Sequence, residues 1–273
     1  MIYLHLLLFV LTIASTIVVG GFLYSFAIMT ILLAHEMGHY LMSRRYGIPA
    51  TLPYFIPLPF PPFGTFGAII KMKGIIINKR ALFDIGIAGP LAGFVAAMPF
   101  IVIGIRFSDV TLLPQMQNGS YILLGDPLLF KILQHFLIGD IPPGRDLILH
   151  PFAYAGWVGL FVTSLNLLPV GQLDGGHIVY SVFGEKSKWA YRGAIAGLAV
   201  LGIFCNLGWL TLVVLILIFG MRHPLPFDND TGLDKGRKRL AVATLFVFIL
   251  SFIPSPFPQM SIMQLLQKEG YLL

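Results

Sequence analysis

The chain has 273 residues, of which 57% are hydrophobic and only 11% are charged. A soluble domain carries about 25% charged residues, and a mean hydropathy of +0.85 implies more apolar surface than water tolerates. The composition therefore excludes an ordinary soluble fold and predicts an integral membrane protein. The formal net charge of +6 comes from a few short connectors, so nucleic acid is not an expected partner. The single cysteine, Cys205, excludes an intrachain disulfide.

Apolar runs suited to membrane helices follow one another along the chain. The first begins without a basic leader, which favours a retained span over a signal peptide. The fourth breaks over Pro169 and Gly171, and the fifth is interrupted near Asn206. The runs cover residues 2–20, 22–42, 82–105, 152–168 with a continuation to 183, 189–219 and 240–253.

Basic residues in the connectors predict the orientation, because Lys and Arg stay on the cytoplasmic side. The connector 44–80 holds six basic residues and no acid, so we expect it inside. The connector 106–150 is richer in acids and is expected on the opposite face, as a re-entrant or surface-lying loop. The basic connector from Arg222 to Arg239 returns inside only if 189–219 is a hairpin, which gives seven passes with the N-terminus inside. One long tilted helix is the alternative.

The strongest chemical signal is the sequence His35-Glu36-Met37-Gly38-His39 near the end of the second run. Helical residues four apart lie about 40° apart around the axis and one turn along it, so both histidines can reach one metal ion. Glu36 flanks them, where a carboxylate can accept a proton from water instead of binding the metal. Gly38, on the other flank, leaves room for a neighbouring helix. The alternative is a polar helix end, but ionisable residues at membrane depth are costly and usually functional.

A tetrahedral metal site with an open position needs a third protein ligand, and Asp174 is the obvious acid in apolar surroundings. It follows the break at Pro169 and Gly171, and backbone that leaves a helix at this depth must line protein or a wet cavity. Asp174 lies twelve residues before Lys186 and His39 five before Arg44, so both are expected near the cytoplasmic interface and can meet. Asp174 could instead cap the helix that restarts at Gly175.

Two more polar residues accompany this ligand. His177 is a weaker candidate, either as a partner of a ligand or as a fourth ligand that would close the site. Asn166 carries an amide that can donate a hydrogen bond to a developing oxyanion. The same amide could instead bond between helices.

The HExxH sequence, followed by Asn166-Leu-Leu-Pro-Val-Gly-Gln-Leu-Asp174-Gly-Gly176, resembles the site-2 protease family of intramembrane zinc metalloproteases. The resemblance includes Gly86–Gly93 and covers residues 30–183. It implies one Zn²⁺ per chain on His35, His39 and Asp174, with Glu36 as general base and Asn166 assisting the substrate or the transition state. Gly171 replaces the second proline of the family motif. The chain has no room for the PDZ or CBS domains of many members, so we expect a compact member.

The resemblance implies an all-α polytopic membrane protein with about six or seven transmembrane helices and a small β element in the connector after the HExxH helix. We expect a single membrane-embedded metalloprotease domain over residues 1–273, with a core at 22–183 and C-terminal helices at 189–253. The implied activity is hydrolysis of peptide bonds within or near transmembrane segments of membrane-anchored substrates, as in regulated intramembrane proteolysis. We expect the site near the cytoplasmic side of the cell membrane.

A strand is expected in residues 64–73, because β-branched and aromatic residues follow a proline-rich stretch there. A substrate helix hides its carbonyls in hydrogen bonds and must be held extended for cleavage. In analogy with the family's membrane-embedded strand, we expect β-augmentation of the substrate. A plain hairpin packed on the helix ends is the alternative. The expected substrate contacts are Gly64, Thr65, Phe66, Gly67 and Ala68.

Other features have structural interpretations. Asp84 is the expected cap of the third helix, and the basic cluster 237–239 is interpreted as a solvated anchor near anionic headgroups. Two glycine pairs are spaced for close helix contact: Gly89 with Gly93, and Gly193 with Gly197.

A transporter that holds a metal or a proton with the same His and Asp residues is the competing function, since broken helices also occur in transporters. The chain shows no internal repeat, and a transporter leaves Glu36 without a role. A catalytically silent binding protein is a third possibility, against which the intact HExxH motif argues.

Overall fold

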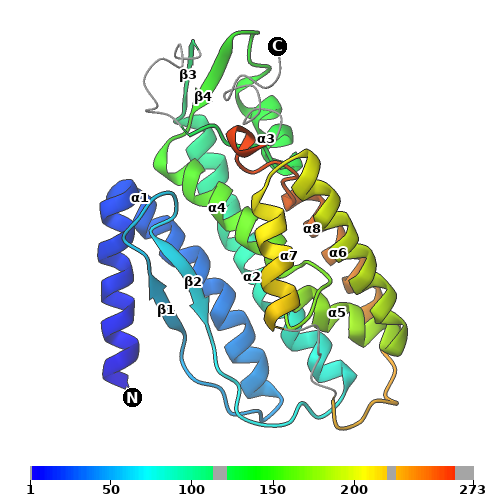
Figure 1. The fold of residues 1–273 in the computed structure, drawn as a ribbon. Coiled ribbons are helices and arrows are strands. Elements are labelled where there is room, and N and C mark those ends of the chain that lie inside the picture. Colours follow the sequence, from blue (N-terminus) through cyan, green and yellow to red (C-terminus); the bar gives the residue numbers. More distant parts are fainter. Residues whose placement is uncertain (1, 113–121, 220–225, 262–273) are drawn as a thin grey trace.

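The computed structural model describes residues 2–112, 122–219 and 226–261, and these are predominantly helical. Long helices pack side by side, a β-hairpin lies along the first of them, and smaller elements gather at one end (Figure 1). Of the described helices, α1 (Ile2–Arg45) and α2 (Lys79–Arg106) are long and apolar enough to cross a membrane. The mostly helical fold with a small β element is therefore confirmed, while the number of membrane passes stays a prediction.

Helix α1 bends sharply at Gly21, whose φ of 79° and ψ of 177° lie outside the helical region. Glycine adopts positive φ readily because it lacks a Cβ. The hydroxyls of Thr16 and Ser25 are 2.7 Å apart, whereas nine residues of a straight helix span about 14 Å. The two halves of α1 therefore lie side by side and correspond to the two predicted runs. The N-terminus and Arg45 lie at the same end of the molecule (Figure 1).

The connector after α1 forms an antiparallel hairpin of β1 (Tyr54–Pro57) and β2 (Thr65–Ile69), as predicted. Its turn packs beside the helices, and three backbone carbonyls of the turn accept hydrogen bonds from side-chain hydroxyls of the helices. Lipid could not supply such donors. The hairpin runs along α1 and does not pack on the helix ends, which was the alternative. The three bonds run from Ser15 to Gly64 at 2.7 Å, from Tyr24 to Phe63 at 2.6 Å and from Tyr154 to Pro62 at 2.6 Å.

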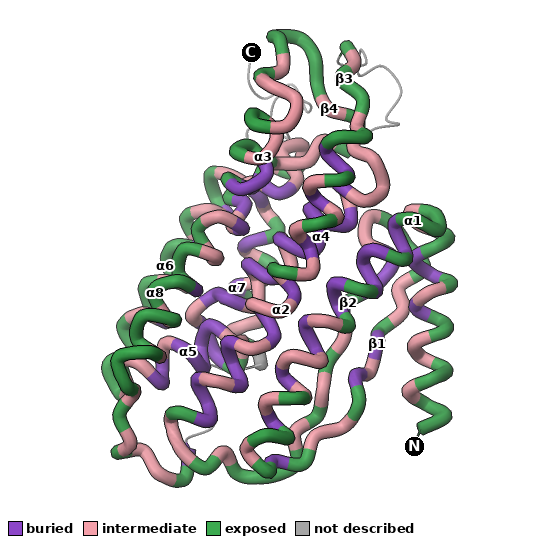
Figure 2. Tube along the Cα trace, turned by 180° about the vertical axis from the view of Figure 1, so that it is seen from behind, coloured by how far each residue is buried: buried purple, intermediate pink, exposed green. Residues whose placement is uncertain are grey.

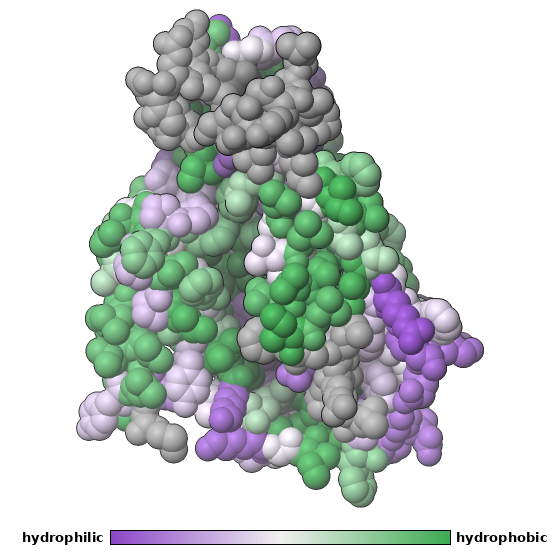
Figure 3. All heavy atoms as spheres, viewed as in Figure 1, coloured by the Kyte–Doolittle hydropathy of each residue, from purple (hydrophilic) through white to green (hydrophobic). Residues whose placement is uncertain are grey.

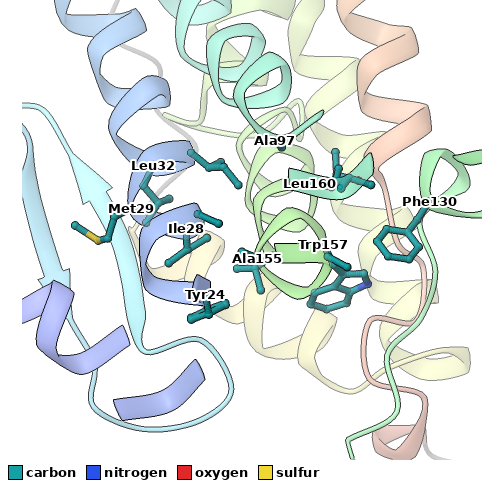
Figure 4. Packing of buried hydrophobic residues seen from close by; sticks show 14 of the residues in the cluster. Tyr24, Ile28, Met29, Leu32, Ala97, Phe130, Ala155, Trp157 and Leu160 are labelled. Atoms are coloured by element: carbon teal, nitrogen blue, oxygen red, sulfur yellow. The ribbon is translucent and has the colours of Figure 1, made fainter. Parts of the chain in front are cut away.

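The main hydrophobic core lies where α2 packs against both α1 and α4 (Pro151–Asn166). Figure 4 shows Ile28 of α1, Ala97 of α2 and Trp157 of α4 within this buried cluster. Burial follows the same pattern, because α2, α4 and α5 carry many buried residues whereas α6 and α8 are largely exposed (Figure 2). Hydrophobic side chains cover much of the visible outer face, and hydrophilic ones gather toward the end that contains Arg45 (Figure 3).

The predicted break in the fourth run is confirmed. Helix α4 ends at Asn166, and α5 (Asp174–Phe183) begins after a turn that contains Pro169 and Gly171. Gly171 has a φ of 53°, a conformation that the usual proline of the family motif could not adopt.

The run 189–219 forms two helices, α6 (Ser187–Phe204) and α7 (Gly208–Phe219), after the short 3₁₀ helix η1 (Gly184–Lys186). Asn206 stabilises the turn between them, because its amide nitrogen donates to the Phe257 carbonyl and its side-chain oxygen accepts from the Gly208 N–H. Leu198 and Trp209 of the two helices share one buried cluster. The hairpin is therefore confirmed over the single long helix. Residues 220–225, including Arg222, lie outside the described part.

The predicted close contact at Gly193 and Gly197 is wrong. In the described part of the chain, no atom lies within 4 Å of a Cβ built on either glycine. The spacing is the same as in a tight helix pair, but among the described residues this face of α6 meets no neighbouring helix.

The connector 106–150 folds more than expected. It contains β3 (Asp109–Leu112), α3 (Leu128–Ile138) and β4 (Arg145–Ile148), with β3 and β4 paired antiparallel. These elements form a cap at the end opposite to Arg45 (Figure 1). The connector predicted as a re-entrant or surface-lying loop therefore contains a helix and a pair of strands. Residues 113–121 lie outside the described part.

Helix α8 (Lys235–Ser251) precedes the short 3₁₀ helix η2 (Pro258–Met260). Its contacts show that the predictions for Asp84 and for Arg237 are wrong. Asp84 does not cap α2, because Asn78 Oδ1 accepts the Ala81 N–H at 2.9 Å and fills that role. Asp84 instead pairs with Arg237, whose Nη2 lies 2.6 Å from Asp84 Oδ2. Arg237 is therefore no solvated anchor, whereas Lys238 and Arg239 are exposed.

Candidate metal centre

The side chains of His35, His39 and Asp174 converge although α1 and α5 are far apart in sequence. His35 Nε2 and His39 Nε2 are 3.1 Å apart, and Asp174 Oδ2 lies 3.5 Å from the former and 3.2 Å from the latter. Two ligands about 2.0–2.1 Å from zinc at a tetrahedral angle are about 3.3 Å apart. The three separations therefore fit one tetrahedral ion, and three protein ligands leave its fourth position open.

A backbone carbonyl orients one ligand. His39 Nδ1 lies 2.8 Å from the Ile85 carbonyl oxygen, and a carbonyl can only accept. Nδ1 therefore carries the proton, and the lone pair of Nε2 points toward the other ligands. Ile85 contributes through its backbone, so no side-chain pattern in the sequence could indicate this role.

Glycines allow α2 to approach the histidines closely. A Cβ built on Gly38 would lie 3.0 Å from Gly89 Cα and would overlap the Ala88 carbonyl. A Cβ on Gly93 would lie 3.1 Å from His35 Nδ1, and one on Gly89 would overlap the His39 ring. The predicted close contacts at Gly38, Gly89 and Gly93 are thus confirmed, because only glycine leaves space for the two imidazoles.

Asp174 does not act as a helix cap. Leu173 occupies the N-cap position of α5, without a side-chain hydrogen bond, and Asp174 is the first helical residue. Its carboxylate points toward the histidines instead. Gly176, two residues later, packs against the broken segment, since a Cβ there would lie 3.0 Å from the Val170 carbonyl oxygen.

A cavity of about 250 Å³ opens beside the three ligands. Glu36 lines it, and so does Ile70, whose backbone lies close to the Glu36 carboxylate. Asn166 also lines it, with its amide nitrogen 3.1 Å from His35 Nε2. His177 shares the wall but does not belong to the group of converging ligand atoms. Larger cavities of about 470 and 390 Å³ exist, but none of the three ligands lines them.

The end of β2 forms one wall of this cavity. Of the predicted substrate contacts, Ala68 lines it, whereas Gly64–Gly67 lie farther along the hairpin toward its turn. Ile69 and Ile70 line the cavity as well. The prediction missed them because the sequence indicates a strand over this segment but not where the strand passes the site.

Residues 23–208 match the family model described as peptidase family M50. The probable zinc metalloprotease EGY1, chloroplastic, of Oryza sativa subsp. japonica is 32% identical in an alignment of 237 residues that covers 84% of this chain and 40% of that protein. The probable zinc metalloprotease EGY2, chloroplastic, of Arabidopsis thaliana is 30% identical in an alignment of 227 residues that covers 82% of this chain and 40% of that protein. The chain thus spans about two-fifths of the length of these curated relatives.

The solved structure of the site-2 protease from Methanocaldococcus jannaschii aligns with 91% of this chain and 86% of that chain. Its identity is 17% and its TM-score is 0.36, which is too low to support an argument. The family match, in contrast, covers more than half of the sequence and includes both motifs. The resemblance predicted from those motifs is confirmed, and the chain belongs to peptidase family M50.

Proposed function

We propose that this protein is a zinc peptidase that hydrolyses peptide bonds within or near the transmembrane segments of membrane-anchored proteins. The observation that carries the proposal is the convergence of His35, His39 and Asp174 on a cavity shared with Glu36. Two imidazoles and one carboxylate with an open fourth position are typical of catalytic zinc. The relatives named as zinc metalloproteases support the same metal.

The residues around the ligands divide the chemistry among them. His35, His39 and Asp174 would hold a zinc ion, which would supply water activation and polarisation of the scissile carbonyl. Glu36, which shares the cavity with the three ligands, accepts the proton of the attacking water and returns it to the leaving amine. Asn166, beside His35, donates a hydrogen bond to the carbonyl oxygen as negative charge develops.

Strand β2 is the proposed binding edge for an extended substrate. Neighbouring backbone N–H groups of a strand point to opposite sides. Because the Lys71 carbonyl accepts from the Thr51 N–H on the β1 side, the N–H groups of Ile70 and Ala68 point to the opposite edge, and both residues line the cavity. A substrate strand paired there would cross the cavity, with Gly64–Gly67 extending the edge toward the turn. Hydrogen bonds to this edge would replace those lost when the substrate helix unwinds.

We place the site near the cytoplasmic side of the cell membrane, in a single membrane-embedded domain. The basic connectors that follow the positive-inside rule lie at the end of the molecule that contains Arg45. His39 is six residues before Arg45, about 9 Å along the helix. The substrate would therefore be cut close to the cytoplasmic end of its transmembrane segment, and we propose regulated intramembrane proteolysis as the process.

Family membership and the position of Glu36 favour the peptidase over the competing transporter. A transporter would give no role to the Glu36 carboxylate, which lines the same cavity as the metal ligands. Metal flux into proteoliposomes, without cleavage of any reconstituted peptide, would reverse this preference.

The substitution Glu36→Gln tests the proposal directly. It keeps the shape of the side chain and removes the base, so zinc content should stay near that of the wild type. Cleavage of a reconstituted single-span peptide should fall about 10²–10⁴-fold, the usual contribution of general acid–base catalysis. The matched control is Glu185→Gln at an exposed position, which should cleave normally. Unchanged cleavage by Glu36→Gln would reject Glu36 as the base.

A further inference from the structure

Three side chains form a clasp at the end of the molecule that contains the metal centre: Tyr46, Asp84 and Arg237. Arg237 donates to both carboxylate oxygens of Asp84, from Nε to Oδ1 at 2.8 Å and from Nη2 to Oδ2 at 2.6 Å. The Tyr46 hydroxyl donates to Asp84 Oδ2 at 2.5 Å and accepts from Arg237 Nη2 at 3.3 Å. The side chains of Arg237 and Asp84 are only 27% and 16% exposed, so solvent screens this pair less than an ordinary surface pair.

The clasp joins three elements. Tyr46 directly follows α1, Asp84 lies in the second turn of α2, and Arg237 lies in the first turn of α8. Arg237 also pairs with Asp234, the N-cap of α8, through Nη1. A bidentate guanidinium–carboxylate pair fixes direction as well as distance, so it restrains the rotation of α2 against both neighbours.

The segment before α8 reinforces this attachment. The N–H groups of Phe227 and Asp228 donate to the carbonyls of Ile76 and Ile77, each at 2.9 Å. Arg80 Nε donates to the Gly232 carbonyl at 3.1 Å. The chain from 227 to 237 is therefore tied to the beginning of α2 at several points.

The first turns of α2 lead directly to the metal ligands. Ile85 follows Asp84, and its carbonyl holds the Nδ1 proton of His39. Gly89, one turn later, contacts the ring of the same histidine. A rotation of α2 that displaces Asp84 would therefore move both the carbonyl and the surface that orient His39.

We propose that Arg237 is a positioning residue for the metal centre, because its ion pair with Asp84 fixes α2 so that Ile85 holds His39 in the geometry that binds zinc. The inference rests on the proposed zinc site. It assigns a role in metal binding to α8, which supplies none of the ligands.

The test compares Arg237→Gln with Arg239→Gln in the full chain. Both variants remove one positive charge from α8, but residue 239 is exposed. Competition with a chelator should show zinc binding weakened about tenfold or more in Arg237→Gln, as for residues that support a ligand, and unchanged in Arg239→Gln. The absorption bands of the Co²⁺-substituted protein should shift in Arg237→Gln only. Arg237→Lys keeps the charge but not the two parallel bonds, so it should recover only part of the affinity.

Equal zinc affinity and equal Co²⁺ spectra in Arg237→Gln and the wild type would overturn the inference. If Arg237→Gln does not fold, Arg237→Lys and the milder Tyr46→Phe decide the question, and wild-type affinity and Co²⁺ spectra in both would overturn it equally. A wild type that binds zinc but cleaves no reconstituted peptide contradicts the proposed function instead. The two failures are therefore distinguishable.

Discussion

At the scale of single residues, the metal centre depends on the absence of side chains as much as on their presence. His39 is held between the Ile85 carbonyl and Gly89, and His35 lies against Gly93. Because α2 contacts both rings closely, even one added methyl group must displace a ligand or a helix. The glycines of α2 therefore determine the ligand geometry although they bind nothing themselves.

The substitution Gly89→Ala should accordingly weaken zinc binding. Its Cβ would overlap the His39 ring, and we expect a loss of about tenfold or more in zinc affinity, measured by competition with a chelator. Gly197→Ala is the control, because a Cβ there meets open space among the described residues. The control should bind zinc normally and be as stable as the wild type or up to about 1 kcal/mol more stable. Normal zinc affinity in Gly89→Ala would show that α2 can move away without cost to the site.

At the scale of elements, a strand and a broken helix meet at the centre. The β1–β2 hairpin lies along α1 because hydroxyl groups of α1 and α4 bind the carbonyls of its turn. This position brings the end of β2 to the same cavity that Gln172 and Leu173 of the broken segment line. Glu36, the proposed base, and the strand edge proposed for the substrate therefore lie in one cavity.

Proline at position 68 tests the role of that edge. Ala68→Pro removes one backbone N–H, whereas Ala68→Val enlarges the side chain and keeps the donor, and valine suits a strand. Ala68→Pro should reduce cleavage of the reconstituted peptide at least about tenfold, the effect of losing roughly 1.4 kcal/mol of substrate binding, with zinc content unchanged. Ala68→Val should cleave nearly normally. Equal activity of the two variants would argue against β-augmentation at this position.

At the scale of the whole molecule, the proposed zinc ion joins two segments that are far apart in the sequence. His35 and His39 come from α1, and Asp174 comes from α5, with α2 packed between their neighbouring turns. A metal that binds only the folded chain stabilises it by mass action, by about 2.7 kcal/mol at a hundredfold excess over Kd. Zinc should therefore act as a crosslink between the N-terminal and central parts of the chain.

Removing Asp174 tests this crosslink. Asp174→Ala should lower the zinc content well below one per chain, measured by elemental analysis, and thermal unfolding in detergent should no longer shift upward on addition of zinc. Asp109→Ala, at an exposed position in β3 at the opposite end, should keep both properties. Full zinc occupancy in Asp174→Ala would refute Asp174 as the third ligand.

The sequence by itself predicted the membrane class, the two motifs and the candidate ligands. These properties are local: hydropathy accumulates along a run, the four-residue spacing of His35 and His39 places both on one helix face, and Pro169 with Gly171 must interrupt a helix. The interruption at Asn206 belongs to the same group, because the amide of that residue stabilises its own turn.

Only the tertiary structure decided which surfaces meet. Asp84 pairs with Arg237 instead of capping α2, and the hairpin lies along α1. Gly193 and Gly197 face no neighbour in the described part of the chain, although Gly89 and Gly93 do. In each case the local pattern permits several partners of similar energy, and the choice depends on how distant helices pack. The Ile85 carbonyl that orients His39 is the extreme example. Every residue carries the same backbone carbonyl, so only the packing of α2 against α1 decides which one meets the histidine.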